Sequence, residues 1–234
     1  MSGHSKWHSI KHKKAATDAK KGKIFTKLAR AITVAAKGNP DPDANFQLRL
    51  AIDQAKAANV PKDNIERAIV RATGEGKDAL VEVMYEAYGP GGVAIIIESL
   101  TDNKNRTVAN LKHILTSHGG SLASTGSVAY LFERKGMVRV KNIGDSPEEM
   151  ELALIDAGAE DISDEEDMKV IISAPEKLKN ILKALGDIEI EYSGLEWIAK
   201  DRVSPDEETQ GKLEKLFEAL EEDDDVNDYS SNLS

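Results

Sequence analysis

The 234-residue sequence contains no cysteine and few aromatic residues, which make up 5% of the chain. The missing thiols exclude disulfides, a cysteine nucleophile and cysteine-ligated metal sites, and they permit a reducing compartment. No apolar run is long enough to span a bilayer, since the best, Val93–Ile97, has the length of a buried strand. The first residues also lack an apolar signal core, so we expect a cytoplasmic protein with no membrane partner.

Charge is distributed very unevenly along the chain. The full sequence has a formal net charge of −10, but residues 1–38 contain ten lysines and arginines against one acid, Asp18, a net of +9. The residues after Gly38 therefore carry −19. A basic segment on an acidic protein usually faces a polyanion, and phosphate backbones are the commonest one. The sequence thus predicts a nucleic-acid-binding arm at the start of the chain.

Most candidate nucleic-acid-binding residues lie in this basic segment. Its lysines would neutralise phosphates, and Trp7, which has no apolar neighbours, would stack on a base. Arg67 and Arg71, one turn apart on an expected helix, would extend the surface. The alternative is a solvated charge run with Trp7 pinned on the domain. The candidate residues are His4, Lys6, Trp7, His8, Lys11, His12, Lys13, Lys14, Lys20, Lys21, Lys23, Lys27, Arg30, Arg67 and Arg71.

The sequence offers little to a metal or to catalysis. His4, His8 and His12 would share one face of a helix, but no carboxylate joins them and lysines crowd them. We expect these histidines to add to phosphate binding instead. No serine or aspartate has a motif relation to the other histidines, and the acids fall in surface runs. We therefore predict a non-enzyme without metal, cofactor or small-molecule substrate, the alternative being catalytic residues distant in sequence.

The apolar pattern up to residue 76 has a helical period. It predicts three short, alanine-rich helices within residues 22–37, 43–58 and 61–73, preceded by the basic arm. Each helix is too short to be stable alone, so we expect them to pack together. A helix-turn-helix with a recognition helix is one interpretation, and an ordinary three-helix bundle is the other.

After residue 77 the apolar period changes to that of strands. Gly89-Pro90-Gly91-Gly92 is expected to be a tight turn, because it lacks the lysine and following helix of a phosphate-binding loop. Residues 128–133 are predicted to form a strand that turns at Arg134-Lys135-Gly136. Capping boxes at Ser146 and Ser204 are expected to start two helices. The predicted strands are 81–88, 93–98, 128–133, 137–141, 159–163, 168–173, 188–192 and 226–233.

The order of these elements predicts a discontinuous domain. Residues 137–202 follow the order strand-helix-strand-strand-helix-strand of a ferredoxin-like unit. The C-terminal helix has an apolar stripe that would be exposed unless it returned to the sheet of residues 88–132. The predicted fold class is α+β, with an N-terminal three-helix domain and basic arm followed by two ferredoxin-like α/β sandwich domains, the last inserted into the middle one. The expected domains are residues 1–76, residues 77–136 with 203–234, and residues 137–202.

Three stretches together resemble the YebC family. They are GHSKWHSIKHKKAATDAKKGKIFTKLAR, NVPKDNIERAI and YGPGGVAIIIESLTDNKNRTVANLKHILTSHGGSLASTGSVAYLFERKG. The family includes bacterial proteins described as probable transcriptional regulators and mitochondrial relatives described as translational activators. The resemblance implies three domains, a cytoplasmic location in bacteria and nucleic-acid binding without catalysis. His8 and Ala123 depart from the family pattern without removing a charge or a turn from the expected binding surface.

These observations predict a non-enzymatic, nucleic-acid-binding regulator of gene expression. A DNA-binding transcriptional regulator is the first hypothesis, and a translational activator that binds RNA or the ribosome is the second. A protein-interaction scaffold whose arm binds an acidic protein is the third. We expect a monomer or a weak oligomer.

Overall fold

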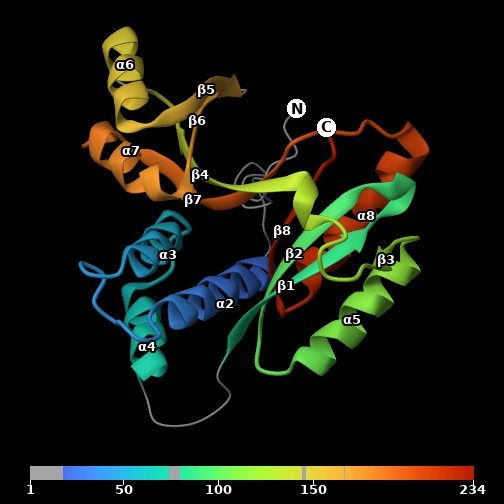
Figure 1. Cartoon of the computed structure of the whole chain (residues 1–234). Coiled ribbons are helices and arrows are strands. Elements are labelled where there is room, and N and C mark those ends of the chain that lie inside the picture. Colours follow the sequence, from blue (N-terminus) through green and yellow to red (C-terminus); the bar gives the residue numbers. More distant parts are fainter. Residues whose placement is uncertain (1–17, 74–79, 144–145, 166) are drawn as a thin grey trace.

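The computed structural model describes residues 18–73, 80–143, 146–165 and 167–234, with side chains from residue 21 onward (Figure 1). Within these residues, three helices are followed by two antiparallel four-stranded sheets, which confirms the predicted α+β class. The helices of the first part are α2 (Asp18–Ala35), α3 (Phe46–Ala57) and α4 (Lys62–Thr73).

The three helices pack on one another through small and branched apolar residues. Leu28 and Ile32 of α2 meet Leu48 and Ala55 of α3 and Ile65 of α4 in one buried cluster. Helix α2 is described from Asp18 to Ala35, so Gly22, which was expected to start the helix, lies inside it. We call this three-helix unit the head.

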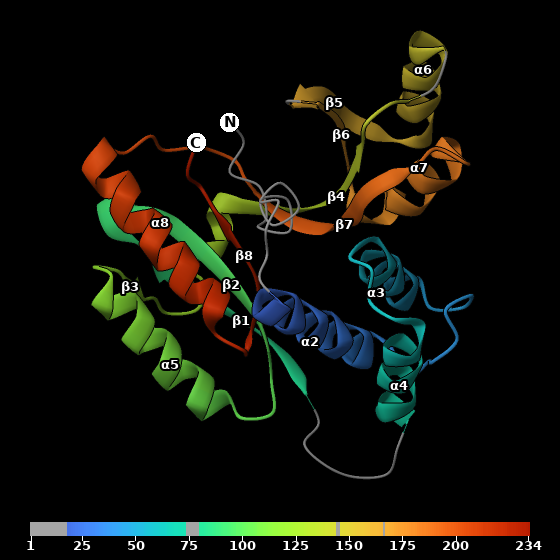
Figure 2. The same cartoon turned by 180° about the vertical axis from the view of Figure 1, so that it is seen from behind.

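The first sheet has the strand order β3-β1-β2-β8 and carries two helices on one face. Ile95 and Ile97 of β2 pack against Leu111 of α5 and Leu216 of α8, and Figure 2 shows both helices in front of this sheet. Strand β8 pairs with β2, so the chain returns to the first sheet after building the second, as the predicted insertion requires. Its elements are β1 (Val81–Tyr88), β2 (Ala94–Thr101), α5 (Lys104–Ser117), β3 (Ser121–Leu122), α8 (Glu207–Glu222) and β8 (Val226–Ser231).

The second sheet has the strand order β5-β6-β4-β7, the order of a ferredoxin-like unit. Val138 of β4 and Ile171 of β6 pack against Leu154 of α6 and Ile181 of α7. Its elements are β4 (Phe132–Val140), α6 (Pro147–Ala157), β5 (Ala159–Glu165), β6 (Met168–Ser173), α7 (Leu178–Leu185) and β7 (Ile190–Ala199).

The predicted turn at Arg134-Lys135-Gly136 is wrong. A short 3₁₀ helix, Ala129–Leu131, precedes one uninterrupted strand, β4, and Gly136 pairs with Ser173 and Leu195 inside the sheet. A Cβ atom on Gly136 would lie 2.9 Å from the Cβ of Leu178, so the glycine permits close packing of α7. Strand β4 therefore crosses the domain boundary that was expected between residues 136 and 137.

In neither of the two predicted capping boxes does the serine side chain cap the helix. Helix α6 begins at Pro147 as expected, but the side chain of Ser146 makes no capping hydrogen bond. Helix α8 is capped by Asp206, whose carboxylate accepts from the Thr209 amide at 2.8 Å. The Gly89–Gly92 turn is confirmed as a 3₁₀ turn, in which Gly91 and Gly92 have positive φ angles of 69° and 74°.

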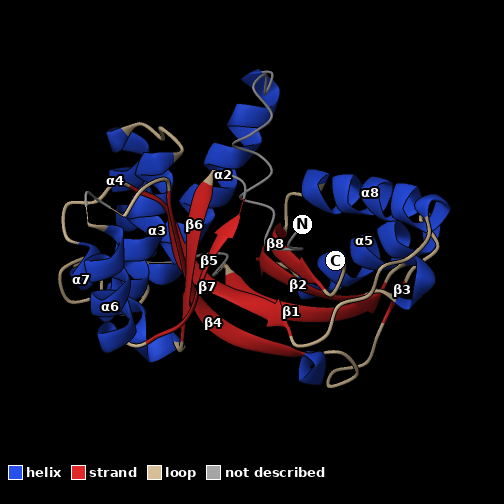
Figure 3. Ribbon diagram, turned by 90° about the horizontal axis from the view of Figure 1, so that it is seen from above, coloured by secondary structure: helices blue, strands red, loops and turns tan. Residues whose placement is uncertain are grey.

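The two sheets are joined through the helix-free face of the first one (Figure 3). Ala94 and Ile96 pack there against Phe132 of β4 and Trp197 of β7. The Arg134 guanidinium lies 5.2 Å from the centre of the Trp197 ring and pairs with Glu98 of β2. The ribbon of β4 and β7 therefore holds the inserted unit to the rest of the chain.

Candidate nucleic-acid interface

The predicted nucleic-acid-binding residues fall into four groups, three of which the structure describes. The first group, from His4 to Lys14, lies outside the described residues, as does the side chain of Lys20. The binding role of this group stays a prediction. Its members are His4, Lys6, Trp7, His8, Lys11, His12, Lys13, Lys14 and Lys20.

The second group, Lys23, Lys27 and Arg30, faces the end of α8. These residues follow one another at i, i+4 and i+7 and so share one face of α2. Lys23 Nζ donates to the Glu222 carbonyl at 3.3 Å, and Lys27 Nζ donates to the Glu221 carbonyl at 2.8 Å. These carbonyls belong to the last turn of α8, where the helix dipole is negative. Both lysines therefore bind the C-terminus of a helix in their own chain.

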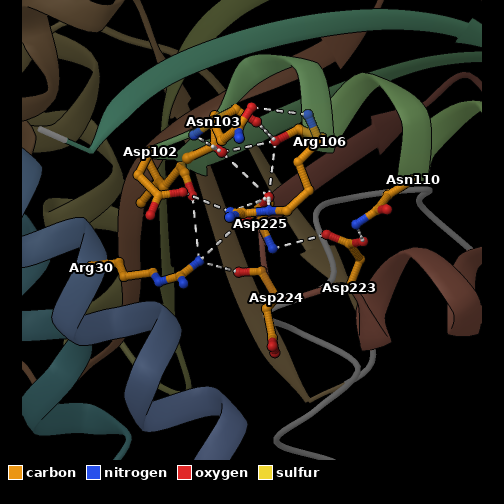
Figure 4. Close-up of polar contacts among 11 residues, drawn as sticks. Arg30, Asp102, Asn103, Arg106, Asn110, Asp223, Asp224 and Asp225 are labelled. Carbon is orange, nitrogen blue, oxygen red and sulfur yellow. Dashed lines mark hydrogen bonds and ion pairs between the residues drawn. The ribbon is translucent and has the colours of Figure 1, made fainter. Parts of the chain in front are cut away.

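Arg30 completes this contact between the head and the first sheet. Its Nη1 donates to the Asp224 carbonyl at 2.6 Å and lies 3.3 Å from Asp225 Oδ1 (Figure 4). The side chain of Asp225 is only 4% exposed, whereas that of Arg30 is 26% exposed. Arg30, which the sequence pattern predicts to bind phosphates, thus pairs with the buried carboxylate of Asp225 where the head meets the first sheet.

Asp225 is the centre of a polar cluster on the first sheet (Figure 4). Arg106 of α5 donates from Nη2 to both carboxylate oxygens at 2.9 Å and from Nε at 3.2 Å. The hydroxyls of Thr107 and Thr101 donate to Oδ2 at 2.9 and 3.3 Å. Burial would raise the pKa of Asp225, but hydrogen bonds from Arg106 and Thr107 and the charges of Arg106 and Arg30 outweigh it. The pKa is therefore lowered, and the carboxylate stays charged.

The lowered pKa of Asp225 predicts an acid-sensitive contribution to stability. An unfolded aspartate titrates near pH 3.9. The contribution is therefore fully present above about pH 5 and is lost as the pH falls through the folded-state pKa. Lowering the pH from about 5 to about 3 is expected to lower the melting temperature of the intact protein. The melting temperature of Asp225→Asn should fall less over the same range. Parallel melting curves for the two proteins across this range would contradict the assignment.

The third group, Arg67 and Arg71, lies on the outer side of α4. Arg67 Nε donates to the Asp63 carbonyl at 3.1 Å, and its Nη2 contacts Asn64. Helix α4 packs near the C-terminal half of α2, where the Thr33 hydroxyl donates to the Ala68 carbonyl at 3.0 Å. Thr33 lies twelve residues after Lys21, about 18 Å along the helix. The structure therefore does not bring Arg67 and Arg71 together with the start of α2.

The fourth group is Lys21 alone, and it lines a large cleft. The cleft lies between α2 and α3 of the head and α7 and β7 of the inserted unit, and its volume is about 960 Å³. Arg49 of α3 and Lys179 and Lys183 of α7 line the same cleft. Sequence reasoning missed the two α7 lysines, because an exposed lysine on an amphipathic helix has the same pattern whether it faces water or a ligand.

The residues that the structure describes show neither a candidate metal site nor a candidate membrane-spanning helix. These residues contain no group of three His, Asp or Glu side chains placed to hold a metal ion. None of the described helices is long and apolar enough to cross a bilayer.

The fold and this charge layout define a class: α+β proteins in which a cationic helical head is set on two larger units with antiparallel sheets. Comparison with known sequences places the chain more narrowly. Residues 5–75 match the TACO1/YebC protein N-terminal domain, and residues 80–233 match the TACO1/YebC second and third domain. The chain belongs to the TACO1/YebC family.

Relatives cover the whole chain. A protein from Kosmotoga olearia, named a probable transcriptional regulatory protein, is 51% identical over 100% of this chain and 94% of its own length. One of the same name from Persephonella marina is 51% identical over 100% of this chain and 96% of its own length. The crystal structure of a conserved hypothetical protein from Aquifex aeolicus superposes with a TM-score of 0.86 at 44% identity, covering 96% of this chain and 95% of that chain.

Proposed function

We propose that this protein is a non-enzymatic regulator of gene expression that acts in the cytoplasm by binding nucleic acid through its head and arm. The observation that carries the proposal is the net +9 of residues 1–38 on a chain of net −10. The names of the relatives, probable transcriptional regulatory proteins, support the regulatory part of the proposal. DNA is the first candidate target on that ground.

RNA or the ribosome is the second candidate target, and α4 favours it. Asp63 and Glu66 share the exposed face of this helix with Arg67 and Arg71, and Glu66 pairs with Lys62 at 3.6 Å. These carboxylates would repel the phosphates on both sides of a major groove. Helix α4 is therefore poorly suited to be a recognition helix, whereas a cationic arm suits structured RNA as well as duplex DNA.

The test is a binding series with duplex DNA, structured RNA and purified ribosomes at several salt concentrations. Changing Lys11, Lys13, Lys14, Lys20 and Lys21 to glutamate is expected to weaken binding about 100-fold or more and to flatten the salt dependence. If the intact protein binds duplex DNA most tightly and the variant loses that binding, the result supports a role in transcription. The same outcome with structured RNA or ribosomes supports a role in translation. The scaffold hypothesis predicts no nucleic-acid binding by either protein at physiological salt.

A matched control carries the same charge change at lysines distant from the arm in sequence. It replaces five exposed lysines, four on α5 and α8 and one just after β7, and its binding is expected to stay within about threefold of the intact protein. Equal loss in both variants would show that net charge, and not the arm, controls binding. The control positions are Lys104, Lys112, Lys200, Lys212 and Lys215.

A further inference from the structure

The cleft beside Lys21 is lined by strand β7 and by three helices, each of which presents one stripe of side chains to it. Lys21 and Phe25 lie one turn apart on α2, and Lys179 and Lys183 lie one turn apart on α7. Phe46 begins the stripe of α3. Elements far apart in the sequence, 21–25 and 179–183, therefore converge on one cavity, and Arg49 of α3 adds a further cation to its lining.

Part of the lining of the cleft is apolar. Phe25 and Phe46 line it together with Met168, Leu182 and Ile190. Among these five, Met168 is buried and the others are half-buried. Proteins bind single-stranded nucleic acids with aromatic rings beside separated cations, so that bases stack on the rings and phosphates contact the lysines.

The charges of the cleft favour an anion although the whole chain is acidic. Its two carboxylates are already paired, Asp53 with Lys56 at 3.5 Å and Glu191 with Lys141 at 3.1 Å. Within the described residues Lys179 and Lys183 form no ion pair, and both are exposed. Lys21 is likewise exposed, so three cations of the cleft remain available to a ligand.

Lys21 directly follows the proposed binding arm in the sequence. Because Lys21 lines the cavity, the arm joins the described part of the chain at a residue of the cleft. A volume of about 960 Å³ is at the upper end of small-ligand sites, which suits a few nucleotides and is too small for a duplex.

We propose that this cleft binds a single-stranded segment of nucleic acid. Its phosphates lie on Lys21, Lys179 and Lys183. Its bases stack on Phe25 and Phe46. The inference rests on the proposed function, because it adds a second contact to a nucleic acid that the arm already holds, and it gives the inserted unit a direct part in binding.

The test uses the full chain and fluorescent twelve-nucleotide probes: oligouridylate, oligothymidylate and a duplex of the same length. Lys179→Glu with Lys183→Glu is expected to weaken single-strand binding at least 10-fold. The slope of log affinity against log salt should flatten by about 1.4, since each single-strand phosphate contact contributes about 0.7. Duplex binding should change less than about threefold, because the duplex does not enter the cleft.

The matched control is Lys112→Glu with Lys215→Glu, two exposed lysines on α5 and α8. This variant should bind the single strands within about twofold of the intact protein. A second measurement replaces uridine by 5-iodouridine, which should photo-crosslink to peptides containing Phe25 or Phe46. Crosslinks confined to other parts of the chain would overturn the proposal.

The remaining outcomes separate the cleft from the arm. If the arm variant loses single-strand binding while the α7 variant keeps it, the cleft proposal fails and the proposed function stands. If the intact protein binds no nucleic acid, both fail. If a twelve-residue polyglutamate binds in place of the oligonucleotides and depends on Lys179 and Lys183, the cleft is a site for acidic peptides and the proposal is overturned.

Discussion

Replacing Asp225 by alanine is expected to lower the free energy of unfolding by about 2–4 kcal/mol. The carboxylate is buried, and it accepts hydrogen bonds from Arg106, Thr107 and Thr101 while pairing with Arg30. Its removal leaves Arg30 and Arg106 without their shared carboxylate, although Arg106 keeps its ion pair with Asp102 at 2.8 Å. The expected loss of unfolding free energy is somewhat smaller than the usual cost of breaking a buried pair, because the Arg106 side chain is 44% exposed and can regain water.

The measurement is a thermal or denaturant melt of the intact protein and the variant. A loss of this size should lower the melting midpoint by roughly 4–16 °C in a chain of this length. The control is Asp224→Ala, because the Asp224 side chain is exposed and Arg30 uses only its carbonyl. The control should cost less than about 0.5 kcal/mol. Equal effects of the two substitutions would contradict the central role of the Asp225 carboxylate.

Replacing Glu86 by alanine is expected to cost about 3 kcal/mol. The Glu86 carboxylate is 3% exposed and accepts from the backbone amides of Gly126, Val128 and Ala129 at 2.6, 2.5 and 2.9 Å. Burial would raise the pKa of Glu86, but these amide hydrogen bonds outweigh it and lower the pKa. Without the carboxylate, buried amides lose their acceptor, and the segment before β4 loses its anchor on β1.

Hydrogen exchange reports this effect locally. The amides of Gly126, Val128 and Ala129 should exchange about 100-fold faster in Glu86→Ala, the factor that about 3 kcal/mol represents. Glu82→Ala is the control, since Glu82 lies on the same strand and is exposed. It should leave exchange at these amides unchanged. Unaltered protection in Glu86→Ala would show that backbone contacts alone hold the segment.

Sequence patterns predicted the elements with strong periodicity and missed those that packing decides. The alternation of Val81–Tyr88 and the stripe of α8 gave elements close to the observed ones, because one buried face fixes each pattern. Gly136 misled the prediction, since a glycine that admits a neighbouring helix looks the same in sequence as a glycine in a turn. The cap of α8 moved from Ser204 to Asp206, because the Ser204 hydroxyl contacts Ser234, thirty residues away.

The candidate interface divides in the same way. The sequence alone determined the charge asymmetry and the α+β class, because composition and local period are properties of neighbouring residues. The family followed from the resemblance of three long sequence stretches. Only the tertiary structure decided what each cation faces. It directed Lys27 and Arg30 to the end of α8, and it placed Lys21 in a cleft with Lys179, since the partners of a side chain are set by packing between segments distant in the chain.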